Sequence, residues 1–313
     1  MNAPGTLFLT HEAGLGHVAP PGHPERVDRL KAVTRALDAP DFDGLTRAEA
    51  PLADERDLLR AHPRGYIDRI RASAPEDGWT QLDPDTFMSP GSLDAALRAA
   101  GGVCAAVDAV LAGKARNAFV GMRPPGHHAE RDVAMGFCLF SSVAIGALRA
   151  LDHHGLKRVA VLDFDVHHGN GTQNVLWAEP RAMFVSSQQM PLYPGTGYAH
   201  ERGAHGQVVN LPLAAGSGGA EMRAAWEPAL EQVEAFGPEL ILVSAGFDAH
   251  AADPLAGLNW TVADFSWITR AICNLAAEVC GGRVVSSLEG GYDLVALGES
   301  VPAHVKALME NGV

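Results

Sequence analysis

The chain has 313 residues, of which 47% are hydrophobic and 19% are charged, a balance typical of a globular protein with a sizeable core. Its formal net charge of −13 disfavours nucleic acid and anionic membranes as partners and is compatible with cationic ones. No window reaches the roughly 18 apolar residues of a membrane span, and the first residues lack the basic and apolar regions of a signal peptide. The four cysteines form no CxxC pair, so we expect buried free thiols in a reducing cytoplasm.

Short apolar segments alternate along the chain with longer segments of helical periodicity. The predicted strands are 6–10, 117–122, 158–164, 182–187, 207–213, 239–247 and 283–289. They are almost continuously apolar, as strands covered on both faces are. The predicted helices are 92–113, 138–155, 221–237, 261–282 and 294–312. The alternation predicts an α/β protein with one parallel sheet and helices on both faces, in which 207–213 is a candidate edge strand.

Local signals refine three parts of this prediction. Thr261 and Asp264 have the spacing of a capping box, which places a helix start at this point. Pro302 predicts a kink or break in the last helix. The region 38–90 is rich in Pro and Asp and has some helical pattern, so we expect helices and loops over one end of the sheet.

Polar side chains follow the predicted strands at the points where the strands end. The segments are HEAGLGH, RPPGHHAE, DVHHGNGTQ, QQMPLYPGTG, DAHAADPLAG and GGYD. In open α/β sheets, ligands bind outside the carboxyl ends of the strands. We therefore expect these segments, which are far apart in the sequence, to meet at one edge of the sheet.

Asp165, His167 and Asp248 are the candidate metal ligands. Two carboxylates and one imidazole form a three-ligand set that leaves an open position, as catalytic zinc requires. Asp163 is either a fourth ligand or a residue that orients a histidine. The DxDxH spacing alone is only a moderate signal.

His127, His128 and Tyr292 are the candidate catalytic residues. Two imidazoles beside an activated water suit base-then-acid work on an amide, and a phenol after a Gly-Gly turn can donate to an oxyanion. Each residue also has an ordinary reading as a packed or surface side chain. A further adjacent pair, His153-His154, lies at a predicted helix C-terminus and is assigned no function.

The motifs RPPGHHA, DFDVHHGNGTQ, YPGTG, SAGFDAHAADPLAG and LEGGYD resemble the histone deacetylase superfamily of zinc amidohydrolases, and HPERVDRL resembles its opening signature. The resemblance covers about residues 10–305. It implies the arginase/deacetylase fold, a single eight-stranded parallel sheet flanked by helices, in one deacetylase domain spanning residues 1–313. It also implies hydrolysis of an N-acyl amine, such as acetyl-lysine or an acetylated polyamine, with release of acetate.

The same resemblance assigns roles to individual residues. It makes Asp165, His167 and Asp248 the ligands of one Zn²⁺ ion, and His127 and His128 the general base and its electrostatic or acid partner. The remaining catalytic assignments are Asp163, which pairs with the first histidine, Asn170, which stands where many members carry an aspartate facing the second, and Tyr292, which stabilises the oxyanion. The substrate tunnel is assigned to Phe137, Tyr193, Leu255, Gly136 and Gly291.

Two further sites follow from the resemblance alone. Arg26 matches an arginine that lines an internal channel for acetate. Backbone carbonyls around Asp163, Asp165 and His167, together with Ser186, match a monovalent-cation site that we expect to hold K⁺. Two positions depart from the family pattern: Gln188 replaces a common histidine, and Met88 falls near the place of an aspartate that holds the substrate backbone, with Asp85 close by.

Several alternatives stay open at this point. A binuclear manganese ureohydrolase shares the fold but needs additional carboxylate ligands, and a non-catalytic acyl-amine binding module would be expected to have lost a ligand, histidine or tyrosine. The sequence leaves undecided the choice between acetyl-lysine and acetylpolyamine, the preferred acyl length and the oligomeric state.

Overall fold

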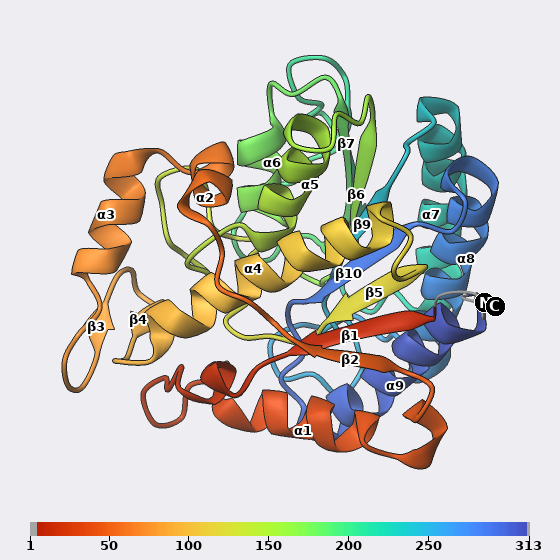
Figure 1. Cartoon of the computed structure of the whole chain (residues 1–313). Coiled ribbons are helices and arrows are strands. Elements are labelled where there is room, and N and C mark those ends of the chain that lie inside the picture. The colour runs from red at the N-terminus through yellow and green to blue at the C-terminus, as the bar shows by residue number, and fades with distance from the viewer. Residues whose placement is uncertain (1–4, 312–313) are drawn as a thin grey trace.

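The computed structural model describes residues 5–311, in which the main sheet has eight parallel strands in the order β2-β1-β5-β10-β9-β6-β7-β8 (Figure 1). The strands are β1 (Thr6–Thr10), β2 (Thr46–Glu49), β5 (Asn117–Val120), β6 (Val159–Asp163), β7 (Ala182–Gln189), β8 (Val208–Leu213), β9 (Ile241–Ala245) and β10 (Val284–Leu288). The predicted parallel sheet is confirmed, and β8 is an edge strand as expected. The other edge, β2, was not predicted because its four residues TRAE are all exposed and carry no apolar pattern.

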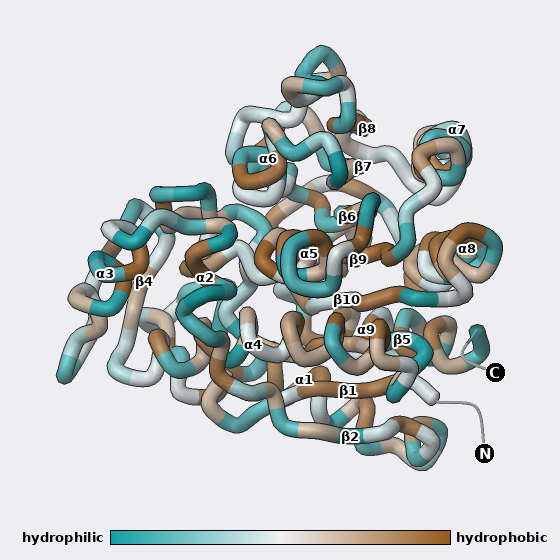
Figure 2. The backbone as a smooth tube through the Cα atoms, turned by 45° about the horizontal axis from the view of Figure 1, so that its top comes forward, coloured by the Kyte–Doolittle hydropathy of each residue, from teal (hydrophilic) through white to brown (hydrophobic). Residues whose placement is uncertain are grey.

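Helices cover both faces of the sheet, as predicted. The helices are α1 (Val27–Leu37), α2 (Glu55–Ala61), α3 (Arg64–Ala72), α4 (Ser92–Leu111), α5 (Ser142–Asp152), α6 (Asn170–Leu176), α7 (Gly219–Phe236), α8 (Val262–Cys280) and α9 (Leu294–Glu310). Alternate strand residues enter separate cores: Val161 packs in the core with α4 and α5, whereas its neighbour Leu162 packs in the core with α7, α8 and α9. Two-sided burial explains why the strands are apolar throughout, as the brown colouring of β9 and β10 in Figure 2 shows.

The predicted helix signals have different outcomes. The Thr261–Asp264 capping box is present at the start of α8. α9 continues through Pro302 as one helix to Glu310, so the predicted break is wrong; residue 312 lies outside the described part. The buried side chains of Leu297 and Val305 hold both halves of α9 against the core, and this packing offsets the missing backbone hydrogen bond.

The region 38–90 contains α2, α3, the edge strand β2 and a short antiparallel hairpin of β3 (Thr80–Gln81) and β4 (Phe87–Met88). Figure 1 shows α3 and this hairpin projecting beyond the end of the sheet. None of the helices in residues 5–311 has the length and apolar character needed to cross a bilayer.

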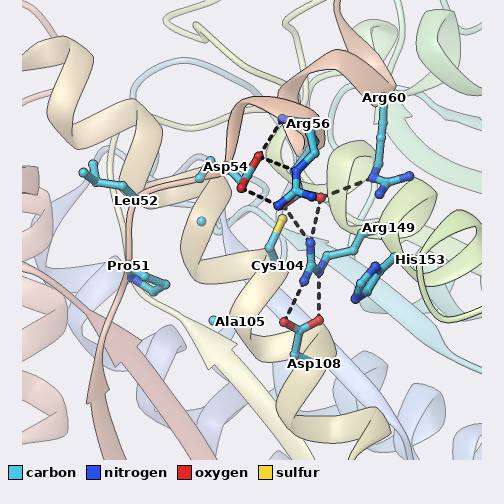
Figure 3. Close-up of a pocket in the computed structure, with 13 residues that line it drawn as sticks. Pro51, Leu52, Asp54, Arg56, Arg60, Cys104, Ala105, Asp108, Arg149 and His153 are labelled. Atoms are coloured by element: carbon cyan, nitrogen blue, oxygen red, sulfur yellow. Dashed lines mark hydrogen bonds and ion pairs between the residues drawn. The ribbon is translucent and has the colours of Figure 1, made fainter.

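An ion-pair network fastens α2 to α4 and α5 around a hollow of about 260 Å³ (Figure 3). The Arg149 guanidinium donates to Asp57 at 2.7 Å and to both oxygens of Asp108 at 2.8 and 2.9 Å. Arg60 also donates to Asp57, at 3.2 Å. Because these carboxylates and guanidiniums neutralise one another, we assign the cluster a structural role.

Candidate active site

Five neighbouring strands, β5, β10, β9, β6 and β7, direct their following segments to the same edge of the sheet. These are the strands that lead into RPPGHHAE, GGYD, DAHAADPLAG, DVHHGNGTQ and QQMPLYPGTG, the last of which begins with the two final residues of β7. Parallel pairing brings their carboxyl ends together, so segments more than a hundred residues apart in the sequence become neighbours.

Asp165, His167 and Asp248 form the one group of three metal-ligating side chains found among residues 5–311, with ligand atoms within 4.8 Å of one another. All three side chains are buried, and His167 Nδ1 lies 3.2 Å from Asp165 Oδ1 and 3.1 Å from Asp248 Oδ2. A Cβ atom at Gly246 would overlap the Asp165 carboxylate, and one at Gly290 would overlap that of Asp248, so the backbone fits closely around the cluster. The group can therefore bind a metal ion.

Electrostatics also favour a cation at this cluster. Burial and the neighbouring Asp165 carboxylate raise the pKa of Asp248 to about 7. Burial lowers the pKa of His167, but hydrogen bonds and charges from Asp165 and Asp248 outweigh it and raise the pKa to about 10. Two buried carboxylates attract positive charge, which a bound divalent ion would supply in place of the histidine proton.

The tandem histidines are buried beside this cluster, with ring centroids 4.0 Å apart. His127 Nδ1 lies 3.0 Å from Asp163 Oδ2, and His128 Nδ1 lies 2.7 Å from Asn170 Oδ1. Burial lowers the pKa of His127, but the Asp165 and Asp163 carboxylates outweigh it and raise that pKa well above the usual value. Burial and the charge of His127 lower the pKa of His128 well below its usual value.

The hydrogen bonds of Asn170 define the tautomer of His128. The Asn170 amide nitrogen donates to Glu130 Oε1 at 2.7 Å, so its Oδ1 is the atom that faces His128. An amide oxygen only accepts, so His128 Nδ1 carries the proton and Nε2 keeps a lone pair. Neutral His128 therefore has a basic atom available in the pocket that its side chain lines.

A pocket of about 240 Å³ leads to these residues. It is lined by Asp85, His128, Gly136, Phe137, His167, Leu192, Tyr193, Leu255 and Tyr292. Four of the five predicted tunnel residues line it, whereas Gly291 lies in the turn before Tyr292. Leu192 was not predicted as a lining residue, since a leucine in a loop has no distinguishing sequence signal.

The wall residue Phe137 and its neighbour Gly136 have positive φ angles of 69° and 57°. A Cβ atom at Gly136 would overlap the His128 ring. The Phe137 amide donates to Thr86 Oγ1 at 3.0 Å, and the Phe137 ring lies edge-on to Tyr292 with centroids 5.8 Å apart. Glycine is therefore needed at position 136 to bring this wall of the pocket against the His128 ring.

Arg26 does not line an internal channel, which corrects the prediction from the resemblance. Its side chain is 53% exposed and lies 4.0 Å from Asp28. α1 begins at Val27, and its inward face carries Arg29, which is 0% exposed. Arg29 Nε donates to the Gly291 carbonyl at 2.6 Å, and its guanidinium carbon lies 4.8 Å from the centroid of the Tyr292 ring.

Asp85, rather than Met88, faces the pocket. Met88 is fully buried, whereas Asp85 is partly exposed at the lining. Burial and the nearby Asp83 raise the pKa of Asp85 to about 6.

The predicted monovalent-cation site has one feature that fits it. Ser186 on β7 pairs in register with Asp163 on β6, and Ser186 Oγ is buried without a hydrogen-bond partner among the described residues. A buried serine oxygen without a hydrogen-bond partner, on the strand next to Asp163, suits a cation with oxygen ligands. Gln188, the departure from the family pattern, donates from Nε2 to the Gly197 carbonyl at 2.6 Å and thereby holds the loop that carries Tyr193.

Two buried carboxylates that the sequence did not single out support the site. Glu289 at the end of β10 accepts hydrogen bonds from the backbone nitrogens of Gly126 at 2.6 Å and His127 at 3.2 Å. Asp253 accepts one from the backbone nitrogen of Tyr292 at 2.7 Å. Their partners lie 163 and 39 residues away, so no local pattern reveals these roles.

Comparisons with known proteins show which family this chain is similar to. The family model described as the histone deacetylase domain matches residues 23–308. The histone deacetylase-like amidohydrolase of Pseudomonas aeruginosa is 41% identical over 306 residues, which cover 93% of this chain and 78% of that protein. Histone deacetylase 14, chloroplastic, of Arabidopsis thaliana is 39% identical over 328 residues, covering 98% of this chain and 77% of the relative.

The fold has an equally extensive match. The crystal structure of the HDA15 HD domain resembles this structure with a TM-score of 0.92 at 32% sequence identity. The match covers 98% of this chain and 89% of that chain. The similarity therefore extends over nearly the whole fold.

Proposed function

Because the chain belongs to the histone deacetylase family, we propose that it is a zinc-dependent deacetylase that hydrolyses an N-acyl amine, with N-acetyl as the preferred acyl group. The observation that carries the proposal is the Asp165–His167–Asp248 cluster beside the neutral His128 in one pocket. The donor set of two carboxylates and one imidazole suits Zn²⁺ with an open position. When bound there, the ion would supply a Lewis acid that polarises the acyl carbonyl and acidifies a water molecule.

The residues of the chain would carry the proton transfers. His128 Nε2 takes the proton of the attacking water because Asn170 holds the proton of the ring on Nδ1. His127, protonated beside Asp163, supplies positive charge, and a histidine returns a proton to the leaving amine. The Tyr292 hydroxyl donates a hydrogen bond to the oxyanion that develops on the carbonyl.

The pocket suits an aliphatic stem that ends in an acylated amine. Phe137 and Tyr193 would enclose the stem, with Leu255 at its rim, and such walls orient the acyl group for attack. Asp85 would accept a hydrogen bond from the substrate near the pocket opening, in the role for which Met88 is unsuited. Acetyl-lysine and acetylated polyamines both satisfy these requirements.

One assay tests the function and narrows the substrate. The purified protein is assayed with an acetyl-lysine peptide, acetylputrescine and a longer-chain acyl-lysine peptide, and its metal content is measured in parallel. We expect about one zinc per chain and release of acetate from at least one acetylated substrate. Absence of hydrolysis from every substrate by zinc-loaded protein would refute the proposal.

A substitution at His128 tests the assigned chemistry. His128→Ala should nearly abolish turnover while leaving the zinc content unchanged, because the residue is no metal ligand. His154→Ala is a matched control, since His154 lies at the C-terminus of α5 and pairs with Asp108 at 2.7 Å. If His128→Ala turns over substrate as fast as wild type, His128 has no catalytic role.

The proposal also covers the domain organisation, a second cation and the cellular location of the protein. We propose that residues 1–313 form one catalytic domain, that K⁺ binds near Ser186 and the backbone of Asp163, Asp165 and His167, and that the protein works in the cytoplasm. A binuclear manganese ureohydrolase is less well supported, since residues 5–311 contain a single three-residue ligand group. A non-catalytic binding module would not require His128 and Tyr292 at the pocket, with His127 packed behind His128.

A further inference from the structure

The backbone before Tyr292 has little intrinsic rigidity. Gly290 and Gly291 precede it, and Gly291 has a φ angle of 119°, a conformation that other residues rarely adopt. Two consecutive glycines leave the turn free to move unless other groups hold it. A hydroxyl that is to stabilise an oxyanion must nevertheless be placed within a few tenths of an ångström.

Asp253 holds this turn from the side of the loop after β9. Its Oδ2 accepts hydrogen bonds from the backbone nitrogens of Tyr292 at 2.7 Å and Asp293 at 3.3 Å. Its Oδ1 accepts one from the backbone nitrogen of Leu255 at 3.0 Å. The bond to Leu255 belongs to an ordinary Asx turn, but the bonds to the Tyr292 turn cross to a segment 39 residues away and have no local purpose.

The opposite side of the turn is held by Arg29, which donates to the Gly291 carbonyl at 2.6 Å. The turn therefore lies between a buried guanidinium that binds its carbonyls and a buried carboxylate that binds its amides. Asp253 is 6% exposed, and no ion pair within 4.0 Å neutralises it in the described part of the chain. Burying a carboxylate without an ion-pair partner costs free energy that a neutral turn residue would avoid, and here the backbone amides of the Tyr292 turn offset that cost.

We propose that Asp253 is a positioning residue that sets the location of the Tyr292 hydroxyl and couples it to the tunnel rim at Leu255. The inference rests on the proposed deacetylase function, because it concerns the oxyanion donor of that reaction. One carboxylate holds both the rim that contacts the substrate stem and the donor that contacts the reacting carbonyl. Its loss should therefore affect the transition state more than the binding of substrate.

A double-mutant cycle tests the proposal. Asp253→Asn keeps the size of the side chain but places an NH₂ group against backbone N–H donors. We expect kcat to fall about 10- to 100-fold, with KM within about 3-fold of wild type and zinc content unchanged. In the Tyr292→Phe background, the same substitution should lower kcat by less than about 3-fold, because the hydroxyl that it positions is already absent.

Asp293→Asn is the matched control. Asp293 caps α9 by accepting from the backbone nitrogens of Val295 and Ala296, and asparagine caps a helix about as well. Its kcat should stay within about 2-fold of wild type. Equal losses from Asp253→Asn in the wild-type and Tyr292→Phe backgrounds, or no loss in either, would overturn the proposal.

Hydrogen exchange separates failure of this inference from failure of the proposed function. The amides of Tyr292 and Asp293 should exchange faster in Asp253→Asn than in wild type or in Asp293→Asn, whether or not a substrate is known. Unchanged exchange would refute the role of Asp253 even if deacetylation is established. If Asp253→Asn does not fold, Asp253→Glu replaces it in the same double-mutant cycle with Tyr292→Phe. This variant keeps the negative charge but moves the carboxylate by one methylene.

Discussion

Replacing Asn170 by aspartate should move the pH dependence of the reaction, because it places a full negative charge beside His128. Asn170 Oδ1 lies 2.7 Å from His128 Nδ1, and burial together with the charge of His127 keeps the pKa of His128 well below its usual value. With charge centres about 4 Å apart and an effective dielectric constant of about 20, the attraction is about 4 kcal/mol. At 1.36 kcal/mol per pKa unit, this raises the pKa of His128 by about 3 units.

The sign of the effect on rate follows from the role of His128 as a base. A base must be unprotonated, so kcat/KM falls at low pH where His128 gains a proton. A raised pKa moves this acid limb to higher pH, by about 2 to 3 units in Asn170→Asp. In wild type, Glu130 accepts a hydrogen bond from the Asn170 amide. In Asn170→Asp, repulsion between Glu130 and the new carboxylate reduces the gain in the pKa of His128, but Glu130 is partly exposed and can turn towards solvent.

The assay is the pH profile of kcat/KM for wild type, Asn170→Asp and Asn174→Asp. Asn174 lies on the same helix, is exposed and contacts the backbone of Arg131, so the same chemical change should leave the profile unmoved. If the acid limb of Asn170→Asp coincides with that of wild type, His128 is not the base.

Three further predictions concern the structure around the site. Gly136→Ala should lower kcat/KM by about 10- to 100-fold, because the added Cβ atom would displace the His128 ring. Gly155→Ala is the control: Gly155 has a similar φ of 72° but open space around it, so this change should lower stability without lowering activity. Equal activities of the two variants would contradict the steric argument. Burial lowers the pKa of His62 and His168 to about 4 and that of His304 to about 3, so these side chains take up protons between these values and pH 6.5 only when the chain unfolds. Each of these three histidines should therefore lower the free energy of unfolding by about 2 kcal/mol at pH 5 relative to pH 7.5. In chemical denaturation, His304→Gln should make this difference between pH 5 and pH 7.5 smaller by about 2 kcal/mol. If the difference is the same in the variant as in wild type, His304 accepts a proton in the folded state. Arg149→Met should lower the free energy of unfolding by about 2 to 4 kcal/mol, because the buried carboxylate of Asp57 (3% exposed) would then have only Arg60 as an ion-pair partner. Arg56→Met should cost under about 0.5 kcal/mol, because the Arg56 side chain is 85% exposed. Similar losses in the two variants would argue against the network.

Much of the arrangement around the metal cluster could be inferred before any coordinates. The continuously apolar strands predicted a sheet that is buried on both faces. Parallel strands bring their carboxyl ends to one edge of such a sheet. That rule alone placed Asp165, His167 and Asp248 together. The polar edge strand β2 escaped detection, since four exposed residues have no apolar pattern.

The sequence by itself determined which chemistry-bearing residues would meet, because local patterns show where each strand ends and parallel pairing brings those ends to one edge of the sheet. Only the tertiary structure decided which side chains hold them in place. Arg26, expected to line an internal channel, lies in solvent just before α1, whereas Arg29 on the inward face of α1 donates to the Gly291 carbonyl. Asp253 and Glu289 became supports of the site through backbone amides distant in sequence, and such contacts exist only once the segments have packed together.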